Sequence, residues 1–333
     1  MKTREKAMPG HHIEKLREAG LIFFIIVIGI LIQFRNQEFL TPLNIRNLLT
    51  NTAILSIVSL GMMLVLITGG IDLSIGATMA FSGMLTALTV SAYPGVPPVL
   101  LVLEGTCIGA VLGALIGFLI ARFSILPIIV SLGFMNIIRG FTYLVSGGQW
   151  VSAYQMPGEF KNLATGTFLG INNLILIAVF MYLFFYYFIN FTRTGRRIYA
   201  VGSNPEAAEL AGLPKKRILW MVYVLMGALA GLGGVLWVAK FASAQGDTAS
   251  GYELNVIAAC VLGGVSVSGG RGNLGGLVLG IILFGILSNA LPLVNVSPFW
   301  QQALQGFVIL GAIITNTWIK RNNDRMALRR RII

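Results

Sequence analysis

Apolar residues form long stretches along nearly the whole chain, and short polar segments separate them. A membrane-spanning helix needs about 20 mostly apolar residues, and ten stretches approach or reach that length. They are residues 20–34, 48–68, 74–91, 97–121, 125–145, 167–190, 218–240, 254–268, 273–291 and 299–319. The pattern predicts an all-α fold, a polytopic membrane helical bundle of about ten transmembrane helices.

These stretches form one transmembrane domain, residues 20–319, between two polar tails. The N-terminal tail, 1–19, mixes both charge signs and contains no apolar signal-peptide core. The apolar run Leu21–Ile32 has no small-residue cleavage site after it, so we interpret it as the first span. The C-terminal tail, 320–333, is basic.

The composition supports a membrane protein. Hydrophobic residues make up 56% of the chain and charged residues only 11%, whereas a soluble domain carries about 25% charged residues. So few charged residues could not cover the surface of a soluble protein, so this composition excludes a soluble enzyme, a disordered protein and a nucleic-acid binder. The 40 glycines, many of them inside apolar runs, indicate close helix packing.

The charge pattern predicts the orientation. The net charge is +12, and most of the Lys and Arg residues fall on one side when the N-terminus is placed in the cytoplasm and the spans alternate. Cytoplasmic segments of membrane proteins carry this excess. Both termini are therefore predicted to be cytoplasmic, as is the basic loop 191–217. The charge then attracts anionic membrane lipid rather than nucleic acid.

The spans lack the side chains of catalytic or metal chemistry. The only histidines, His11 and His12, lie in the N-terminal tail, and the only acids within or beside the spans are Asp72 and Glu104. No phosphate-binding loop of the form G-x-x-x-x-G-K-[ST] occurs, and the G-x-G-x-x-G at Gly270–Gly275 lacks the acid of a dinucleotide site. We predict no catalytic residue, no metal site and no cofactor bound by this chain.

Glycines spaced by four residues mark three predicted spans. The sets are Gly109, Gly113 and Gly117; Gly227 and Gly231; and Gly272, Gly276 and Gly280. Each set lies on one helix face, where two backbones can approach closely. Two interpretations follow: packing within the bundle, or a stripe that forms a subunit interface.

Two glycine-rich segments interrupt the apolar pattern, Thr68–Gly76 and Leu262–Gly270. Each has Gly-Gly followed by alternating apolar and small polar residues. Matching breaks in two halves of a transporter indicate a transport path. Asp72 and Ser74 are therefore candidates to line that path; Asp72 alternatively caps the third span through its side-chain oxygen.

Polar side chains inside the spans are further candidates for the path. They are Asn136, Arg139, Asn289 and Gln305. Such residues either line a polar path or form hydrogen bonds between helices, and the second role is the more common.

The longest internal polar segment, Phe191–Arg217, contains a short predicted helix. Asn204 is the expected N-cap and Pro205 the first helical residue. The strong helix formers Glu206–Ala211 follow, and Gly212 ends the helix. The helix is either simply solvated or a docking element for a cytoplasmic partner.

Three motifs resemble one family. The segment Gly195–Gly212 fits G-R-x-x-Y-A-x-G-x-N-x-x-A-A-x-x-x-G, Thr68–Gly76 fits T-x-G-I-D-L-S-x-G, and Gly251–Gly272 begins G-Y-E-L and ends G-G-R-G. Together they span the chain in order, and they resemble the permease subunits of ABC importers for ribose, xylose, arabinose, galactose and autoinducer-2. The EAA-x-x-x-G at Glu206–Gly212 resembles the loop by which such permeases fit onto an ATPase. Unlike in maltose-type permeases, Leu213-Pro214 follows the glycine at once.

The resemblance implies a function and partners. The chain would be the permease of an ATP-driven importer of a monosaccharide or similar carbohydrate in the bacterial inner membrane. Its partners would be a second permease, identical or different, an ATP-binding subunit that holds the ATP and magnesium, and a periplasmic sugar-binding protein. The implied coupling residues are Asn204, Glu206, Ala207, Ala208 and Gly212. An ion-coupled secondary transporter is the runner-up, and a membrane enzyme acting on lipid-linked sugars is the third hypothesis.

The outer loops 146–166 and 241–253 are the expected surface for the binding protein. Trp150, Tyr154, Lys161 and Asp247 are the candidate contacts. The alternative is that these side chains anchor the helices at the membrane–water interface.

Overall fold

The computed structural model describes residues 9–293 and, after them, only positions 297, 299, 300, 302, 303, 306, 307, 310, 311 and 314. Except for these single positions, the predicted span 299–319 lies outside the described residues. Gln305 and the tail 320–333 also lie outside them.

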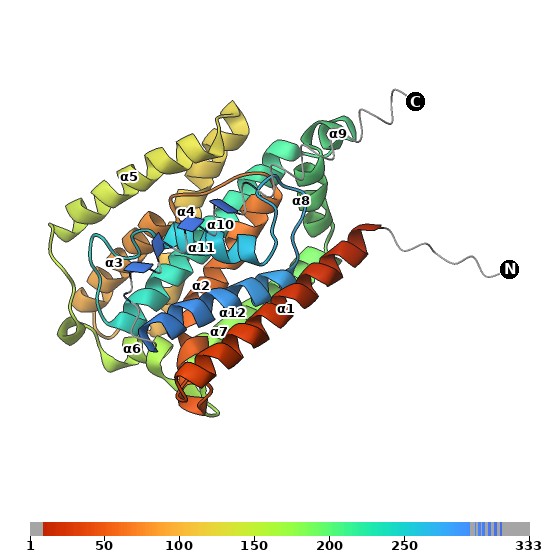
Figure 1. Cartoon of the computed structure of the whole chain (residues 1–333). Helices are drawn as coiled ribbons and strands as arrows, with labels where there is room; N and C mark the ends of the chain where they lie inside the picture. The colour runs from red at the N-terminus through yellow and green to blue at the C-terminus, as the bar shows by residue number, and fades with distance from the viewer. Residues whose placement is uncertain are drawn as a thin grey trace, which may run out of the picture.

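The described chain is a bundle of helices packed side by side (Figure 1). The elements in order are α1 (Pro9–Arg35), α2 (Pro42–Ile67), α3 (Ile75–Ala92), α4 (Pro98–Phe123), α5 (Pro127–Ser146), the 3₁₀ turn η1 (Ala153–Gln155), α6 (Gly158–Thr165), β1 (Thr167–Phe168), β2 (Ile171–Asn172), α7 (Asn173–Phe191), α8 (Arg193–Ser203), α9 (Pro205–Leu210), α10 (Lys215–Phe241), α11 (Tyr252–Leu262) and α12 (Leu274–Leu293). The helices α2, α4 and α5 begin with proline, at Pro42, Pro98 and Pro127, where the missing N–H has no helical partner to lose.

Eight helices in the described part of the chain are long and apolar enough to cross a membrane. The predicted all-α, polytopic bundle is therefore confirmed. The first of these helices begins earlier than the predicted span, because α1 starts at Pro9 and continues without a break through residue 35.

The predicted eighth span, 254–268, is wrong. Its place is taken by α11, which has 11 residues and is about 16 Å long, roughly half of a membrane's hydrocarbon thickness. The helix ends at Leu262 because Gly264 has φ of +79°, a conformation that a right-handed helix does not contain. Gly269 and Gly270, with φ of +86° and +73°, keep the next residues non-helical.

The predicted sixth span, 167–190, starts too early. A two-stranded hairpin, β1 with β2, occupies its first residues, and the helix α7 begins only at Asn173. The hairpin turn requires positive φ at Leu169 and Gly170. Asn172 then caps the helix by accepting a hydrogen bond from Leu174 N at 2.9 Å.

The helix α2 lies at the centre of the bundle, and its residues from Ala53 to Ile67 are nearly all buried. It contacts α7, α8, α10, α11 and α12. In contrast, few residues of α1, α5 and α7 are buried, and each of these helices has exposed apolar side chains, as expected for helices that face lipid or another subunit.

The glycine stripes serve packing within the chain. A Cβ at Gly109 would meet Gly227 O, and one at Gly113 would meet Tyr223 O, so α4 and α10 touch backbone to backbone. In the same way, a Cβ at Gly280 would meet Ala259 O. The intramolecular interpretation is therefore confirmed for these stripes.

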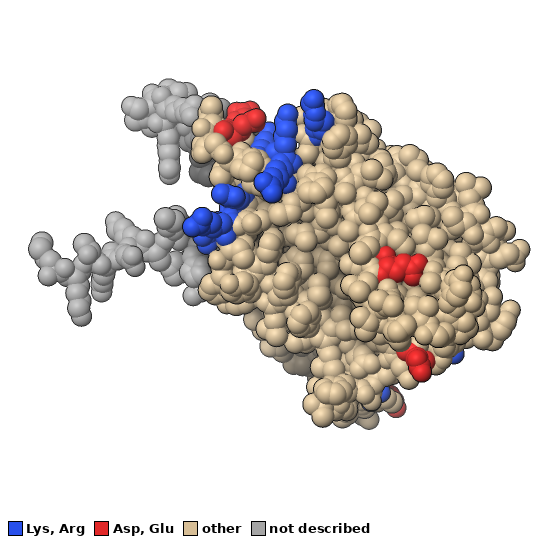
Figure 2. Space-filling model, turned by 180° about the vertical axis from the view of Figure 1, so that it is seen from behind, with Lys and Arg blue, Asp and Glu red and all other residues tan. Residues whose placement is uncertain are grey.

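Basic side chains gather mainly at one end of the molecule, as Figure 2 shows for the face turned away in Figure 1. The helix α8 and the start of α10 lie at that end and supply Arg193, Arg196, Arg197, Lys215, Lys216 and Arg217. We call it the α8/α9 end, and the other the far end.

Candidate functional site

The loop 191–217 folds into two helices. The sequence predicted only the second one. The first, α8, begins where Thr192 Oγ1 accepts a hydrogen bond from Gly195 N at 3.0 Å. Its residues Ile198 and Val201 are buried. The missed signal was this threonine cap followed by an apolar pair on one helix face.

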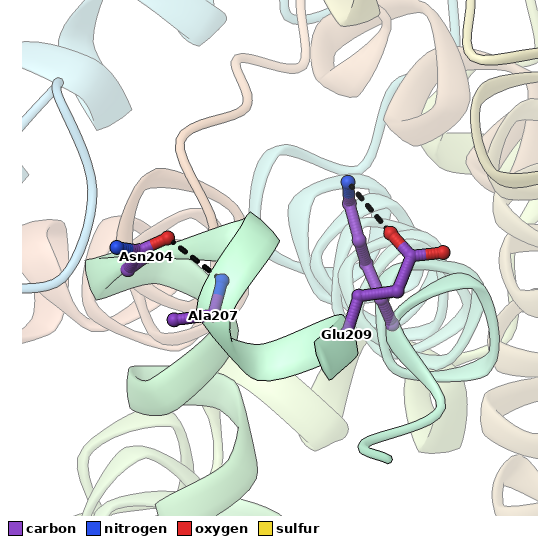
Figure 3. A network of polar contacts seen from close by, with 4 residues as sticks. Asn204, Ala207 and Glu209 are labelled. Atoms are coloured by element: carbon purple, nitrogen blue, oxygen red, sulfur yellow. Dashed lines mark hydrogen bonds and ion pairs between the residues drawn. The ribbon is translucent and has the colours of Figure 1, made fainter. Parts of the chain in front are cut away.

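The second helix, α9, forms as predicted (Figure 3). Asn204 Oδ1 accepts a hydrogen bond from Ala207 N at 2.9 Å, and Pro205 is the first helical residue. Gly212 ends the turn with φ of +76°, which glycine adopts without strain. Lys215 Nζ lies 3.7 Å from Glu209 Oε2, an exposed ion pair that adds little stability.

The predicted coupling residues divide into two groups. Asn204, Glu206, Ala207 and Gly212 are exposed, whereas Ala208 is 6% exposed and anchors α9 on the bundle. Leu210, which the sequence analysis did not single out, is 91% exposed. Among the large hydrophobic residues that the structure describes it has the highest exposed fraction, which makes it a candidate anchor for a partner protein.

Replacing Asn204 with alanine removes the cap of α9. We expect the change to destabilise this helix by about 1 kcal/mol and to weaken its docking on a partner by about fivefold. Asn204→Ser is the matched control, because serine also caps helices. Quantitative pull-down of the ATPase subunit measures the effect; equal retention by Asn204→Ala and the native chain would contradict it.

The helix α8 contacts both glycine-rich segments. A Cβ at Gly202 would collide with Ile67 O, at the end of α2. Tyr199 donates a hydrogen bond from Oη to Gly272 O at 2.6 Å, just before α12. The two segments also touch each other, because Gly270 N donates to Ile67 O at 2.8 Å. The pair of breaks predicted from the sequence therefore meets at one place, directly on α8.

The first break leads into α3, whose first turn lies beside the first turn of α11. A Cβ at Gly76, in the first turn of α3, would meet Ala249 O, and Glu253 Oε2 in the first turn of α11 would lie 2.7 Å away. Non-helical backbone at membrane depth is tolerated where protein buries it or where it lines a cavity. This arrangement is typical of the discontinuous helices of transporters.

Asp72 holds the turn before α3. It is 2% exposed, and its Oδ1 accepts hydrogen bonds from Ser74 N at 2.8 Å and from Ser74 Oγ at 2.6 Å. The N-cap of α3 is Ser74 rather than Asp72. Of the two predicted roles, the contacts favour the structural one, although Asp72 lies two residues before the cap position.

The other polar span residues behave differently from one another. Asn289 bridges α12 and α2 through a reciprocal amide pair with Asn44, at 2.9 and 3.1 Å. Arg139 donates from Nη1 to Gly246 O and Thr248 O, both at 2.8 Å, and so joins α5 to the segment before α11. Asn136 is exposed and donates only within its own helix, to Leu132 O at 3.0 Å, among the bonds of the described residues.

Replacing Arg139 with glutamine should destabilise the protein. The carbonyls of Gly246 and Thr248 lose a charged donor at membrane depth, which costs about 2 kcal/mol. We expect a lower unfolding temperature in detergent. Asn136→Leu, on the exposed side of the same helix, should leave it unchanged. Equal unfolding temperatures for both variants would show that these two bonds contribute no stability.

The two outer segments with the predicted binding-protein contacts are joined. Val151 and Ala244 exchange backbone hydrogen bonds of 3.0 Å in both directions. Trp150, Tyr154 and Asp247 are exposed, whereas Lys161 is half-buried and donates to Ala153 O at 3.2 Å. Trp150 and Tyr154 thus belong to one of the two joined segments and Asp247 to the other.

A pocket of about 410 Å³ opens at the α8/α9 end. Gly69 and Gly70 of the first break line it together with Glu209 and Lys215. Tyr223 also lines it, and its buried hydroxyl has no hydrogen-bond partner among the described residues. The helix α9, through Glu209, and the first break therefore line the same pocket.

Comparisons with known proteins agree over most of the chain. Residues 44–313 match the family model described as "Branched-chain amino acid transport system / permease component". The ribose import permease of Bacillus subtilis is 40% identical over 89% of this chain and 90% of its own length. The L-arabinose ABC transporter permease of Azospirillum brasilense is 34% identical over 94% and 91%. The galactose/methyl galactoside import permease of Escherichia coli K12 is 33% identical over 90% and 93%. No solved structure gives a significant match.

Proposed function

Because the chain belongs to the family of branched-chain amino acid transport system permease components, we propose that it carries a monosaccharide through the bacterial inner membrane in an ATP-driven importer. The chain is a multi-pass membrane permease, and ATP hydrolysis belongs to a separate subunit. The observation that carries the carbohydrate class is the set of relatives: ribose, arabinose and galactose permeases, each similar over nine tenths of both chains.

The α8/α9 end is the cytoplasmic end in this proposal. The basic side chains gathered there agree with the positive-inside rule, and α1 begins at the same end (Figure 1). Since α9 projects from it with Leu210 exposed, the ATPase subunit binds there. The coupling residues Asn204, Glu206, Ala207 and Gly212 surround that leucine.

The α8 contacts supply the route of coupling. A movement of α9 displaces α8, which touches Ile67 through Gly202 and Gly272 through Tyr199. Both glycine-rich breaks therefore shift together, and they adjoin the starts of α3 and α12. Gly69, Gly264, Gly269 and Gly270 have positive φ, so substitutions there would strain the breaks.

The remaining partners follow from the same proposal. A sugar-binding protein delivers substrate at the far end, where Trp150, Tyr154, Lys161 and Asp247 lie on or beside two joined segments. A second permease, identical or different, completes the membrane unit. The exposed apolar faces of α1, α5 and α7 contact that subunit or membrane lipid.

The substrate class is tested by uptake into proteoliposomes that contain the complete importer. The probes are labelled D-ribose, L-arabinose, D-galactose and methyl galactoside, each with the importer's binding protein, and L-leucine as an example of the branched-chain amino acids in the family description. We expect uptake of one or more sugars and none of leucine. Uptake of leucine alone would overturn the carbohydrate proposal.

A further inference from the structure

We propose that a pocket at the far end, between α2, α10, α11 and α12, binds the monosaccharide after its delivery. The inference rests on the proposed function, from which it takes the substrate class. The pocket has a volume of about 360 Å³, within the range of small-molecule sites. It is lined by the first half of α2 and the last turns of α10 and α12, which places it on the binding-protein side of the membrane.

Aromatic side chains form one wall of this pocket. Trp237 and Tyr252 meet edge to face, with ring centroids 5.1 Å apart and an interplanar angle of 78°. Phe241 lies on Trp237 at 4.8 Å, and all three line the cavity. Trp237 and Tyr252 are half-buried within the protein, unlike side chains of an interfacial aromatic belt. Flat aromatic faces match the apolar C–H face of a sugar ring.

Neutral polar groups complete the lining. The amides of Asn51, Asn255 and Asn289 and the hydroxyl of Ser288 line the cavity. Each amide both donates and accepts hydrogen bonds, as each sugar hydroxyl does. The single charged residue among the lining residues is Lys240, whose Nζ donates to Asn51 Oδ1 at 2.8 Å.

The side-chain oxygen of Asn255 is a candidate acceptor for a hydroxyl group of the sugar. Among the described residues, Asn255 Oδ1 is buried and has no hydrogen-bond partner. Burying an unpaired acceptor is costly, and most such groups in proteins are satisfied. A sugar hydroxyl that entered the pocket would donate to this oxygen.

The lining favours a sugar over an amino acid. The ammonium group of an amino acid needs a carboxylate or a set of acceptors to replace water, and no acidic residue is among those that line the pocket. Lys240 would instead repel that ammonium group. The lining therefore favours the sugars named for the relatives over the branched-chain amino acids named in the family description.

The first test is the loss of a polar group. In proteoliposomes with the complete importer and saturating loaded binding protein, Asn255→Leu should lower the uptake rate about tenfold. The matched control is Asn190→Leu, a change at an exposed asparagine of α7 whose side chain donates to Tyr186 O of its own helix at 2.9 Å. This control should keep the native rate.

The second test detects sugar binding in the pocket directly and does not depend on the rate of uptake. Ser288→Cys is made with Cys107→Ala, since Cys260 is buried, and is alkylated from outside by a membrane-impermeant maleimide. A saturating concentration of the sugar that the native importer takes up should slow the alkylation at least about fivefold, and L-leucine should not. Alkylation that the transported sugar leaves unchanged would overturn this pocket as the sugar site. If the native importer takes up no sugar at all, the proposed function itself fails.

Discussion

Replacing Gly202 with alanine is expected to abolish sugar uptake while leaving the protein folded in the membrane. A Cβ at this position would collide with Ile67 O, and Gly270 N lies 3.0 Å from it. Because Ile67 O also accepts the hydrogen bond from Gly270 N, the added methyl group pushes α8 away from both breaks at once. Overpacking of this kind costs about 1–3 kcal/mol.

The effect on function should be larger than the effect on stability. The coupling route needs α8 to stay in contact with both breaks, so we expect uptake to fall more than about tenfold. The ATPase subunit should still co-purify, because α9 is unchanged, but loaded binding protein should no longer stimulate ATP hydrolysis. Uptake and co-purification are measured on the same preparations.

The control for Gly202 is Gly20→Ala. A Cβ at Gly20 has no atom within 4 Å, and the residue lies in a helix, where alanine is favoured. This variant should transport at the native rate. If Gly202→Ala also transports normally, α8 does not pass movement to the breaks.

Replacing Leu210 with aspartate is expected to remove the ATPase subunit from the complex. The leucine side chain is 91% exposed at the tip of α9, and an apolar anchor in a partner's pocket is worth several kcal/mol. A carboxylate buried in that pocket would be unpaired, which adds a desolvation penalty. We expect the amount of co-purified ATPase to fall at least tenfold.

The matched control is Leu169→Asp. Leu169 is also a leucine of the exposed surface, 86% exposed, on the hairpin before α7. Because α7 ends at Phe191, directly before α8, the hairpin at its start lies at the far end of the molecule, so this change should not alter ATPase binding. Normal ATPase binding by Leu210→Asp would show that α9 docks through other side chains or not at all.

Local chemistry made part of this site predictable. The start of α9 at Asn204 and Pro205 and its end at Gly212 depend on caps and on one positive φ, which neighbouring residues determine. The long helices were also predictable, because the length and composition of an apolar run decide whether it can span a membrane.

Tertiary contacts account for what the sequence left open. Nothing in the pattern indicates that Ile67 would accept a hydrogen bond from Gly270, more than 200 residues away, or that both would lie on Gly202. The run 254–268 has the composition of a span, but the glycines after α11 turn the backbone before a membrane could be crossed.

The polar span residues show the same limit. Arg139 and Asn136 lie three positions apart on α5, yet one bonds the segment before α11 and the other faces outward. Which face of a helix meets the bundle depends on its neighbours, and an isolated sequence does not contain that information.

The most direct test of the account is the source of energy for uptake. Proteoliposomes with the complete importer, ATP on the ATPase side and loaded binding protein on the other are treated with ionophores that collapse all ion gradients. We predict that sugar uptake continues at its full rate and stops when ATP is omitted or when Leu210→Asp is used. Uptake that stops with the ionophores and proceeds without ATP would contradict the account and indicate an ion-coupled carrier.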